Sequence, residues 1–118
     1  MNYYRGMFKI LANWVLNAIA LYIVAQLLRG VMVDDFWAAL IAVVIIGLIN
    51  ALIKPLLLLL TLPINVLTLG LFTFVINALL LMLAGNITPG FRIDGFGTAF
   101  IASILLSVIS MVLHTLVK

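Results

Sequence analysis

Cysteine is absent from the 118-residue chain, and charge is scarce, with six Lys or Arg and three Asp or Glu side chains. Without cysteine the chain can form no disulfide, no thiolate nucleophile and no thiolate metal site. The basic residues are scattered singly along the sequence: Arg5, Lys9, Arg29, Lys54, Arg92 and Lys118. A nucleic-acid-binding protein normally gathers such residues into a basic stripe, so this distribution argues against that class.

Apolar side chains are what the sequence has in excess. Hydrophobic residues make up 68% of the chain, and the mean hydropathy is +1.46. Soluble domains contain about 45–50% apolar residues, and a domain of this length could not bury so many more. The apolar runs cover about 9–28, 36–53, 66–85 and 96–117, each near the ~20 residues of a membrane-spanning helix. The sequence therefore predicts an all-α integral membrane protein with four transmembrane helices in one membrane domain, residues 1–118.

The first apolar run superficially resembles a signal peptide, because Arg5 and Lys9 precede it. It is about 20 residues long and has no obvious small-residue cleavage site, so we interpret it as a retained span.

The connecting segment 54–65 lies between the second and third apolar runs and contains Pro55 and Pro63. Proline removes a helical hydrogen bond, so we expect Pro55 to end the second helix and the segment to be interfacial or re-entrant.

The two halves of the chain resemble each other at an offset of sixty residues. The stretch "VLNAIAL" matches "VINALLL", and "GVMVDDFWAALIA" matches "GFRIDGFGTAFIA". Such self-similarity indicates a duplicated helical hairpin, with repeat 1 at about 9–53 and repeat 2 at about 66–117. Each repeat has two spans, so both enter the membrane in the same direction and form a parallel repeat.

The distribution of Lys and Arg predicts the orientation. Four of the six fall on the side of the chain termini, so the positive-inside rule predicts that both termini lie in the cytoplasm. The acidic residues fall on the opposite side. Asp34 and Asp94 are repeat counterparts just before the second and fourth helices. We expect them to cap these helices, with Gly30 and Gly90 supplying the preceding turns; the alternative is an acidic ring at a pore mouth that selects cations.

Polar side chains within the predicted spans are the remaining candidates for a site. Asn17 and Asn77 are repeat counterparts, which either form interhelical amide hydrogen bonds or line a polar path. Ser103, Ser107, Ser110 and His114 share one face of the fourth helix, and Asn50 and Lys54 occupy the positions of the last two in the second helix. We expect tight helix packing along this face. The alternative is a hydrated groove or an anionic-lipid headgroup site at Lys54, His114 and Lys118.

The stretches "INALIKPLLLLLTLPINVLTLGLFTFVINALLLMLAG", residues 49–85, and "PGFRIDGFGTAF", residues 89–100, resemble the four-transmembrane phage holin family, superfamily IV. The motif residues that carry the resemblance are Asn50, Ala51, Leu52, Ile53, Pro55, Leu62, Pro63, Leu67, Thr68, Leu69, Gly70, Asn77 and Ala78. The resemblance implies a multi-pass protein of the bacterial inner membrane, and an oligomer that forms lesions in that membrane. No helix is conspicuously amphipathic, however, so only the serine face could contribute to a polar pore wall.

These observations predict a holin-like homo-oligomer that contacts membrane lipid and permeabilises the membrane. The alternative is a non-enzymatic envelope scaffold or a lipid-binding membrane protein without pore activity. A transporter of small substrates fits less well, because the repeats are parallel and no intramembrane charge pair is evident. His114 has no neighbouring carboxylate or further ligand in the sequence pattern, so we expect no catalytic site, no metal site and no cofactor.

Overall fold

The computed structural model describes residues 2–68 and 70–117. The elements found there follow the chain in this order: α1 (Asn2–Leu27), β1 (Val31–Val33), α2 (Phe36–Leu52), α3 (Lys54–Leu60), α4 (Leu62–Leu67), α5 (Phe72–Ile87), β2 (Phe91–Ile93) and α6 (Phe96–Val117). The strands have three residues each, and the rest of the secondary structure is helical. The predicted all-α membrane architecture is therefore confirmed, with a small two-stranded ribbon added.

Three helical stretches are long and apolar enough to cross a membrane: Arg5–Leu27, Phe36–Leu60 and Phe96–Val117. The fourth apolar helix, α5, has 16 residues and is therefore only about 24 Å long. It begins at Phe72, later than the position near residue 66 that hydropathy suggested. The four expected helices are present, and the third is shorter than the ~30 Å hydrocarbon core.

Helix α2 ends at Leu52, just before Pro55, as predicted, but α2 and α3 form one apolar helical stretch, Phe36–Leu60. The amide of Ile53 donates to the carbonyl oxygen of Ile49 at 2.8 Å, and that of Leu57 donates to Ile53 at 3.1 Å. Pro55 lies in the first turn of α3, where a missing N–H removes no helical bond. Helices α2 and α3 thus follow each other in one stretch, and the chain turns around α4. The N-terminal half of the predicted connecting segment 54–65 prolongs a helix.

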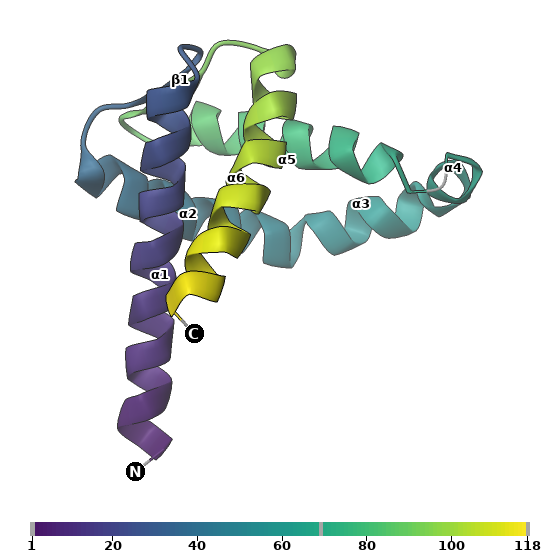
Figure 1. The fold of residues 1–118 in the computed structure, drawn as a ribbon. Helices are drawn as coiled ribbons and strands as arrows, with labels where there is room; N and C mark the ends of the chain where they lie inside the picture. Colours follow the sequence, from purple (N-terminus) through teal and green to yellow (C-terminus); the bar gives the residue numbers. More distant parts are fainter. Residues whose placement is uncertain (1, 69, 118) are drawn as a thin grey trace.

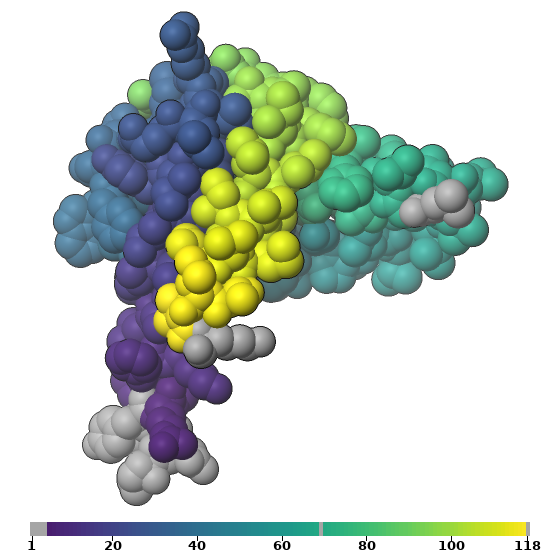
Figure 2. All heavy atoms as spheres, viewed as in Figure 1, coloured from purple at the N-terminus to yellow at the C-terminus, as the bar shows by residue number. Residues whose placement is uncertain are grey.

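The helices form two arms that cross each other below the ribbon, where α1 packs against α2 and α6 against α5 (Figure 1). Helices α1 and α6 pack together in one arm, and the α2–α3 helix packs with α5 in the other. The N- and C-termini lie toward the free end of the first arm, and α4 lies at the free end of the second. The space-filling view shows the two arms extending away from each other (Figure 2).

The ribbon of β1 and β2 relates the two halves of the chain. The strands are antiparallel and pair Val31 with Ile93, Met32 with Arg92, and Val33 with Phe91. Adding sixty to a residue of β1 gives a residue of β2, so the first and third pairs exchange and the central pair maps onto itself. This is the register that a two-fold axis through the Met32–Arg92 pair produces.

The backbone hydrogen bonds beside the ribbon obey the same relation. The amide of Asp34 donates to the carbonyl oxygen of Gly90 at 2.8 Å, and the amide of Asp94 donates to Gly30 at 2.9 Å. The arms also correspond, because α1 packs on α6 as α5 packs on α2. The two halves of the chain therefore take equivalent places in the fold.

Small side chains fill the places where the helices meet. Nine alanines in the described part of the chain belong to this core: Ala18, Ala20, Ala38, Ala39, Ala42, Ala78, Ala84, Ala99 and Ala102. Small residues let helix backbones approach closely, which is the main source of packing energy between helices in lipid. The outward faces carry large apolar side chains such as Trp37, which is 70% exposed. Only 6% of the most apolar stretch of α6 is buried within the protein, so lipid must cover the rest.

Candidate functional site

Asp35, and not Asp34, caps α2, so the predicted cap at Asp34 is wrong. The carboxylate of Asp35 accepts a 2.8 Å hydrogen bond from the amide of Ala38. Asp34 lies one residue earlier, where its backbone is tied to the ribbon, and its carboxylate pairs with Arg92 at 3.3 Å. Both side chains of this pair are 57% exposed, so the pair is solvated and contributes little stability.

Asp94 lies two residues before the first residue of α6. The first backbone bond of this helix is made by Gly95, whose carbonyl oxygen accepts from the amide of Ala99 at 3.0 Å. The carboxylate of Asp94 lies against Gly30. Asp34 and Asp94 therefore sit on opposite strands of the ribbon, and the pore-mouth role remains a prediction.

The first polar cluster joins α1 to α6. The hydroxyl of Ser110 donates to Oδ1 of Asn17 at 2.8 Å, and Nε2 of His114 lies 3.2 Å from the same oxygen. Because an amide oxygen only accepts hydrogen bonds, Nε2 of His114 must carry the proton in this contact. We call Asn17, Ser110 and His114 the closed cluster, because Oδ1 of Asn17 joins the other two side chains.

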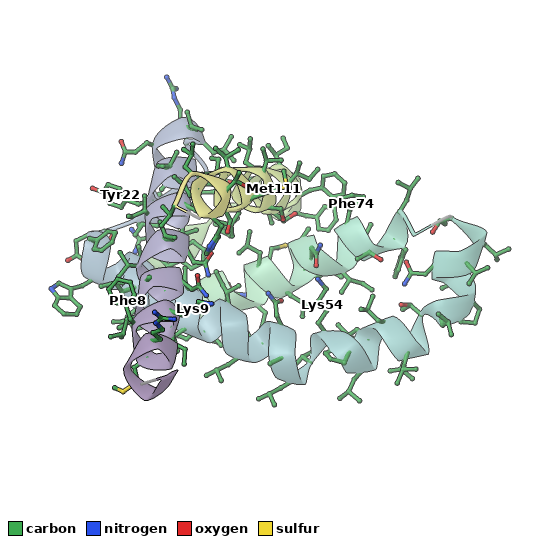
Figure 3. All side chains as sticks on the ribbon, turned by 60° about the horizontal axis from the view of Figure 1, so that its bottom comes forward. Phe8, Lys9, Tyr22, Lys54, Phe74 and Met111 are labelled. Atoms are coloured by element: carbon green, nitrogen blue, oxygen red, sulfur yellow. The ribbon has the colours of Figure 1, made fainter. Side chains whose placement is uncertain are left out.

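The second polar cluster surrounds a cavity of about 110 Å³ between the α2–α3 helix, α5 and α6. Its lining residues, which we call the polar groove, are Ile46, Asn50, Lys54, Asn77, Leu81, Ser103, Leu106 and Ser107. Figure 3 shows Lys54 between the α2–α3 helix and α5. The groove brings together most of the polar residues that the sequence singled out on three different helices.

The serines of the polar groove direct their hydrogens into their own helix. Ser103 donates to the carbonyl oxygen of Phe100 at 2.8 Å, and Ser107 donates to that of Ser103 at 3.0 Å. No hydrogen bond or ion pair joins the side chains of Asn50, Lys54 and Asn77 to another described residue. The groove thus offers an ammonium group and two amides with unused hydrogen-bonding capacity.

The closed cluster and the polar groove occupy equivalent places in the two arms. Asn77 is the counterpart of Asn17, Asn50 of Ser110, and Lys54 of His114. The same three positions are therefore joined by hydrogen bonds in one arm, whereas no hydrogen bond between described residues joins them in the other. The sequence predicted the polar positions, but it could not predict this division.

A larger cavity of about 840 Å³ lies beside the free ends of α1 and α6. Its lining residues are Arg5, Phe8, Lys9, Ala12, Asn13, Leu16, His114 and Val117. Arg5, Lys9 and Asn13 recur at four-residue spacing, which places them on one face of α1. That spacing is a signal that sequence analysis missed. Lys118, which was predicted to contact lipid headgroups together with His114, lies outside the described residues.

Asn65 is another polar residue that sequence analysis missed. It is only 9% exposed, and its amide group joins α4 to α5. Its Nδ2 donates to the hydroxyl of Thr61 at 3.3 Å, and its Oδ1 accepts from the hydroxyl of Thr73 at 3.3 Å. A lone asparagine within a leucine-rich stretch was the available signal. Its role is to hold the turn at the end of the second arm.

No three His, Cys, Asp or Glu side chains gather into a possible metal site within residues 2–68 and 70–117. The acidic residues lie at the ribbon, whereas His114 lies near the far end of α6. The chemistry available in the polar groove is therefore hydrogen bonding and charge attraction by Lys54, Asn50 and Asn77.

Sequence comparison connects the chain with bacterial membrane proteins. Residues 8–112 match the family described as "Mycobacterial 4 TMS phage holin, superfamily IV". The chain is 43% identical over 109 residues to "Uncharacterized membrane protein YvlD" of Bacillus subtilis, a match that covers 92% of both chains. It is 37% identical over 112 residues to "Uncharacterized protein SCO3922" of Streptomyces coelicolor, with 90% of both chains covered. No solved structure is significantly similar to the chain.

Proposed function

We propose that this chain, which belongs to the mycobacterial 4 TMS phage holin family of superfamily IV, assembles with copies of itself and permeabilises the bacterial inner membrane. Membership of the family makes it a holin-like, multi-pass membrane protein. The observation that supports permeabilisation is the polar groove, where Lys54, Asn50 and Asn77 have unused hydrogen-bonding groups on the surface of an otherwise apolar protein.

Lipid is a poor environment for this groove. An unpaired polar group in the hydrocarbon core costs several kcal/mol, so it draws in water or a partner. Helix α5 is about 24 Å long and shorter than the bilayer core, and such a mismatch thins the membrane locally and favours association. Copies that turn their grooves toward a shared interior would relieve both costs and leave water across the membrane.

The distribution of basic residues gives this assembly an orientation in the membrane. Arg5, Lys9 and Lys54 lie toward the free ends of the arms, whereas Arg29 and Arg92 lie near the ribbon. With Lys118, the basic residues assigned to the free ends would number four against two. The positive-inside rule then places the free ends and both termini in the cytoplasm.

Release of a small dye from liposomes tests the proposal. We expect release to rise steeply with the ratio of protein to lipid, because only an oligomer encloses a wet interior. Lys54→Leu should reduce release at least tenfold, whereas Lys9→Leu, on the exposed face of α1, should leave release nearly unchanged. Vesicles that stay sealed at high protein density, with correct insertion shown by protease protection, would contradict the proposal.

A second candidate is an envelope scaffold that assembles without a pore. Gly47 favours it, because this exposed residue of α2 has no atom within 4 Å of the position that a Cβ would occupy. A neighbouring helix could therefore approach the backbone there. Gly47→Leu should then reduce the oligomer mass in detergent, as should Ser107→Leu, whereas Gly6→Leu should not. Assembly that depends on Gly47 in vesicles that remain sealed would favour the scaffold over the pore.

A further inference from the structure

We infer that the polar groove is a binding site for a phosphate group, carried by an anionic membrane lipid or free in solution. The inference does not depend on pore activity. It starts from the comparison of two equivalent places in one molecule, the closed cluster and the polar groove. Duplication supplied both with the same backbone setting, and their side chains have since diverged.

At the centre of the closed cluster, one amide oxygen is shared by two neighbouring side chains. Oδ1 of Asn17 already accepts from Ser110 at 2.8 Å and contacts His114 at 3.2 Å. Three side chains from two helices are thus joined through one oxygen. A position that only had to hold helices together would be expected to look like this.

The polar groove differs in both charge and hydrogen bonding. Asn50 and Lys54 replace Ser110 and His114, so the groove gains a permanent positive charge and an additional amide. The ammonium group offers three donors, and each amide offers two. The only ion pair among the described residues joins Asp34 to Arg92 at the ribbon, which leaves Lys54 without a carboxylate partner there. An anion with several acceptor oxygens is the complement of such a site.

The size and position of the groove favour phosphate. A volume of about 110 Å³ accommodates a few water molecules at about 30 Å³ each, or one phosphate group, but no acyl chain. Lys54 lies 18 residues beyond Phe36, about 27 Å along the helix, which is near the depth of the headgroups. Apolar side chains of Ile46 and Leu106 border the groove, so the acyl chains of a lipid could lie outside it while its phosphate enters.

Binding to the full-length protein in uncharged maltoside micelles tests the inference. Native mass spectrometry would measure the occupancy of phosphatidylglycerol and of diacylglycerol, which lacks the phosphate. Isothermal titration calorimetry would measure binding of inorganic phosphate. We expect phosphatidylglycerol to bind one per chain and diacylglycerol not to bind. Inorganic phosphate that binds with the same dependence on Lys54 would show that free phosphate is also a ligand; its failure to bind would identify the lipid as the source.

Four variants distinguish this site from general charge attraction. Lys54→Gln should weaken binding about tenfold or more, Asn77→Ala should weaken it severalfold, and Lys54→Arg should retain most of it. Lys9→Gln removes a charge elsewhere and should have no effect. Equal binding by Lys54→Gln and the unmodified protein, or equal occupancy by diacylglycerol, would overturn the inference. Because dye release plays no part in this assay, the site and the pore can fail separately.

Discussion

The hydroxyl of Ser110 donates a 2.8 Å hydrogen bond to the amide oxygen of Asn17, joining residues 93 positions apart. Asn17 belongs to the first helix and Ser110 to the last, so this bond fastens the two ends of the chain into one arm. It comes from the first helix of repeat 1 and the last helix of repeat 2. In the second arm, the last helix of repeat 1 packs on the first helix of repeat 2, α5.

Replacing Asn17 with alanine should lower the free energy of unfolding by about 0.6–2 kcal/mol, the range for interhelical hydrogen bonds in membranes. Ser110→Ala should have a similar effect. The double variant should cost less than the sum of the two, because both remove one interaction. Stepwise addition of a denaturing detergent to mixed micelles unfolds each variant, and the transition gives its free energy of unfolding. Strictly additive losses would show that the bond contributes no coupling energy.

Asp35→Ala should destabilise the protein by about 1 kcal/mol, because the amide of Ala38 loses its acceptor at the start of α2. Asp34→Ala should cost less, because its pair with Arg92 is exposed. Thermal unfolding of the two variants in the same detergent makes the comparison.

In channel recordings, Asp34→Ala combined with Asp94→Ala should leave the cation preference unchanged. A changed preference would instead establish the acidic ring at a pore mouth.

Gly30→Ala should destabilise the protein by about 1–3 kcal/mol, the usual cost of overpacking. A Cβ at Gly30 would lie 2.7 Å from Cγ2 of Thr98, beside the carboxylate of Asp94. Gly47→Ala is the matched control, because a Cβ there meets no atom within 4 Å and alanine is the better helix former. Equal stability of both variants in a thermal unfolding assay would contradict the close approach at the ribbon.

Single-cysteine labelling should place the two ends of the chain on the same face of the membrane. The chain has no cysteine of its own, so each variant carries one label site. Gly6→Cys and Thr115→Cys should react with a membrane-impermeant maleimide only from the cytoplasmic face, and Met32→Cys only from the opposite face. Labelling of Gly6→Cys and Thr115→Cys from different faces would disprove the parallel arrangement of the repeats.

The sequence was informative wherever a property depends on composition or on spacing along the chain. Hydropathy predicted the membrane helices, and the sixty-residue offset predicted equivalent positions that the structure then pairs across the ribbon. Local chemistry was less reliable. Pro55 follows the end of α2 as expected, but it lies in the first turn of another helix rather than in an irregular connection. Asp34 matched Asp94 in the repeat, yet Asp35 is the residue that reaches the free amide of α2.

The sequence by itself determined that this protein lies in lipid and that its two halves resemble each other. Apolar content and self-similarity are properties of the chain that any fold must accommodate. Only the tertiary structure decided which polar residues satisfy one another. Asn17 and Ser110 meet because α1 lies against α6, whereas the equivalent contact between α5 and the α2–α3 helix brings together Asn77, Asn50 and Lys54. The partners in such contacts depend on how distant helices cross, and the spacing within any one helix does not specify that crossing.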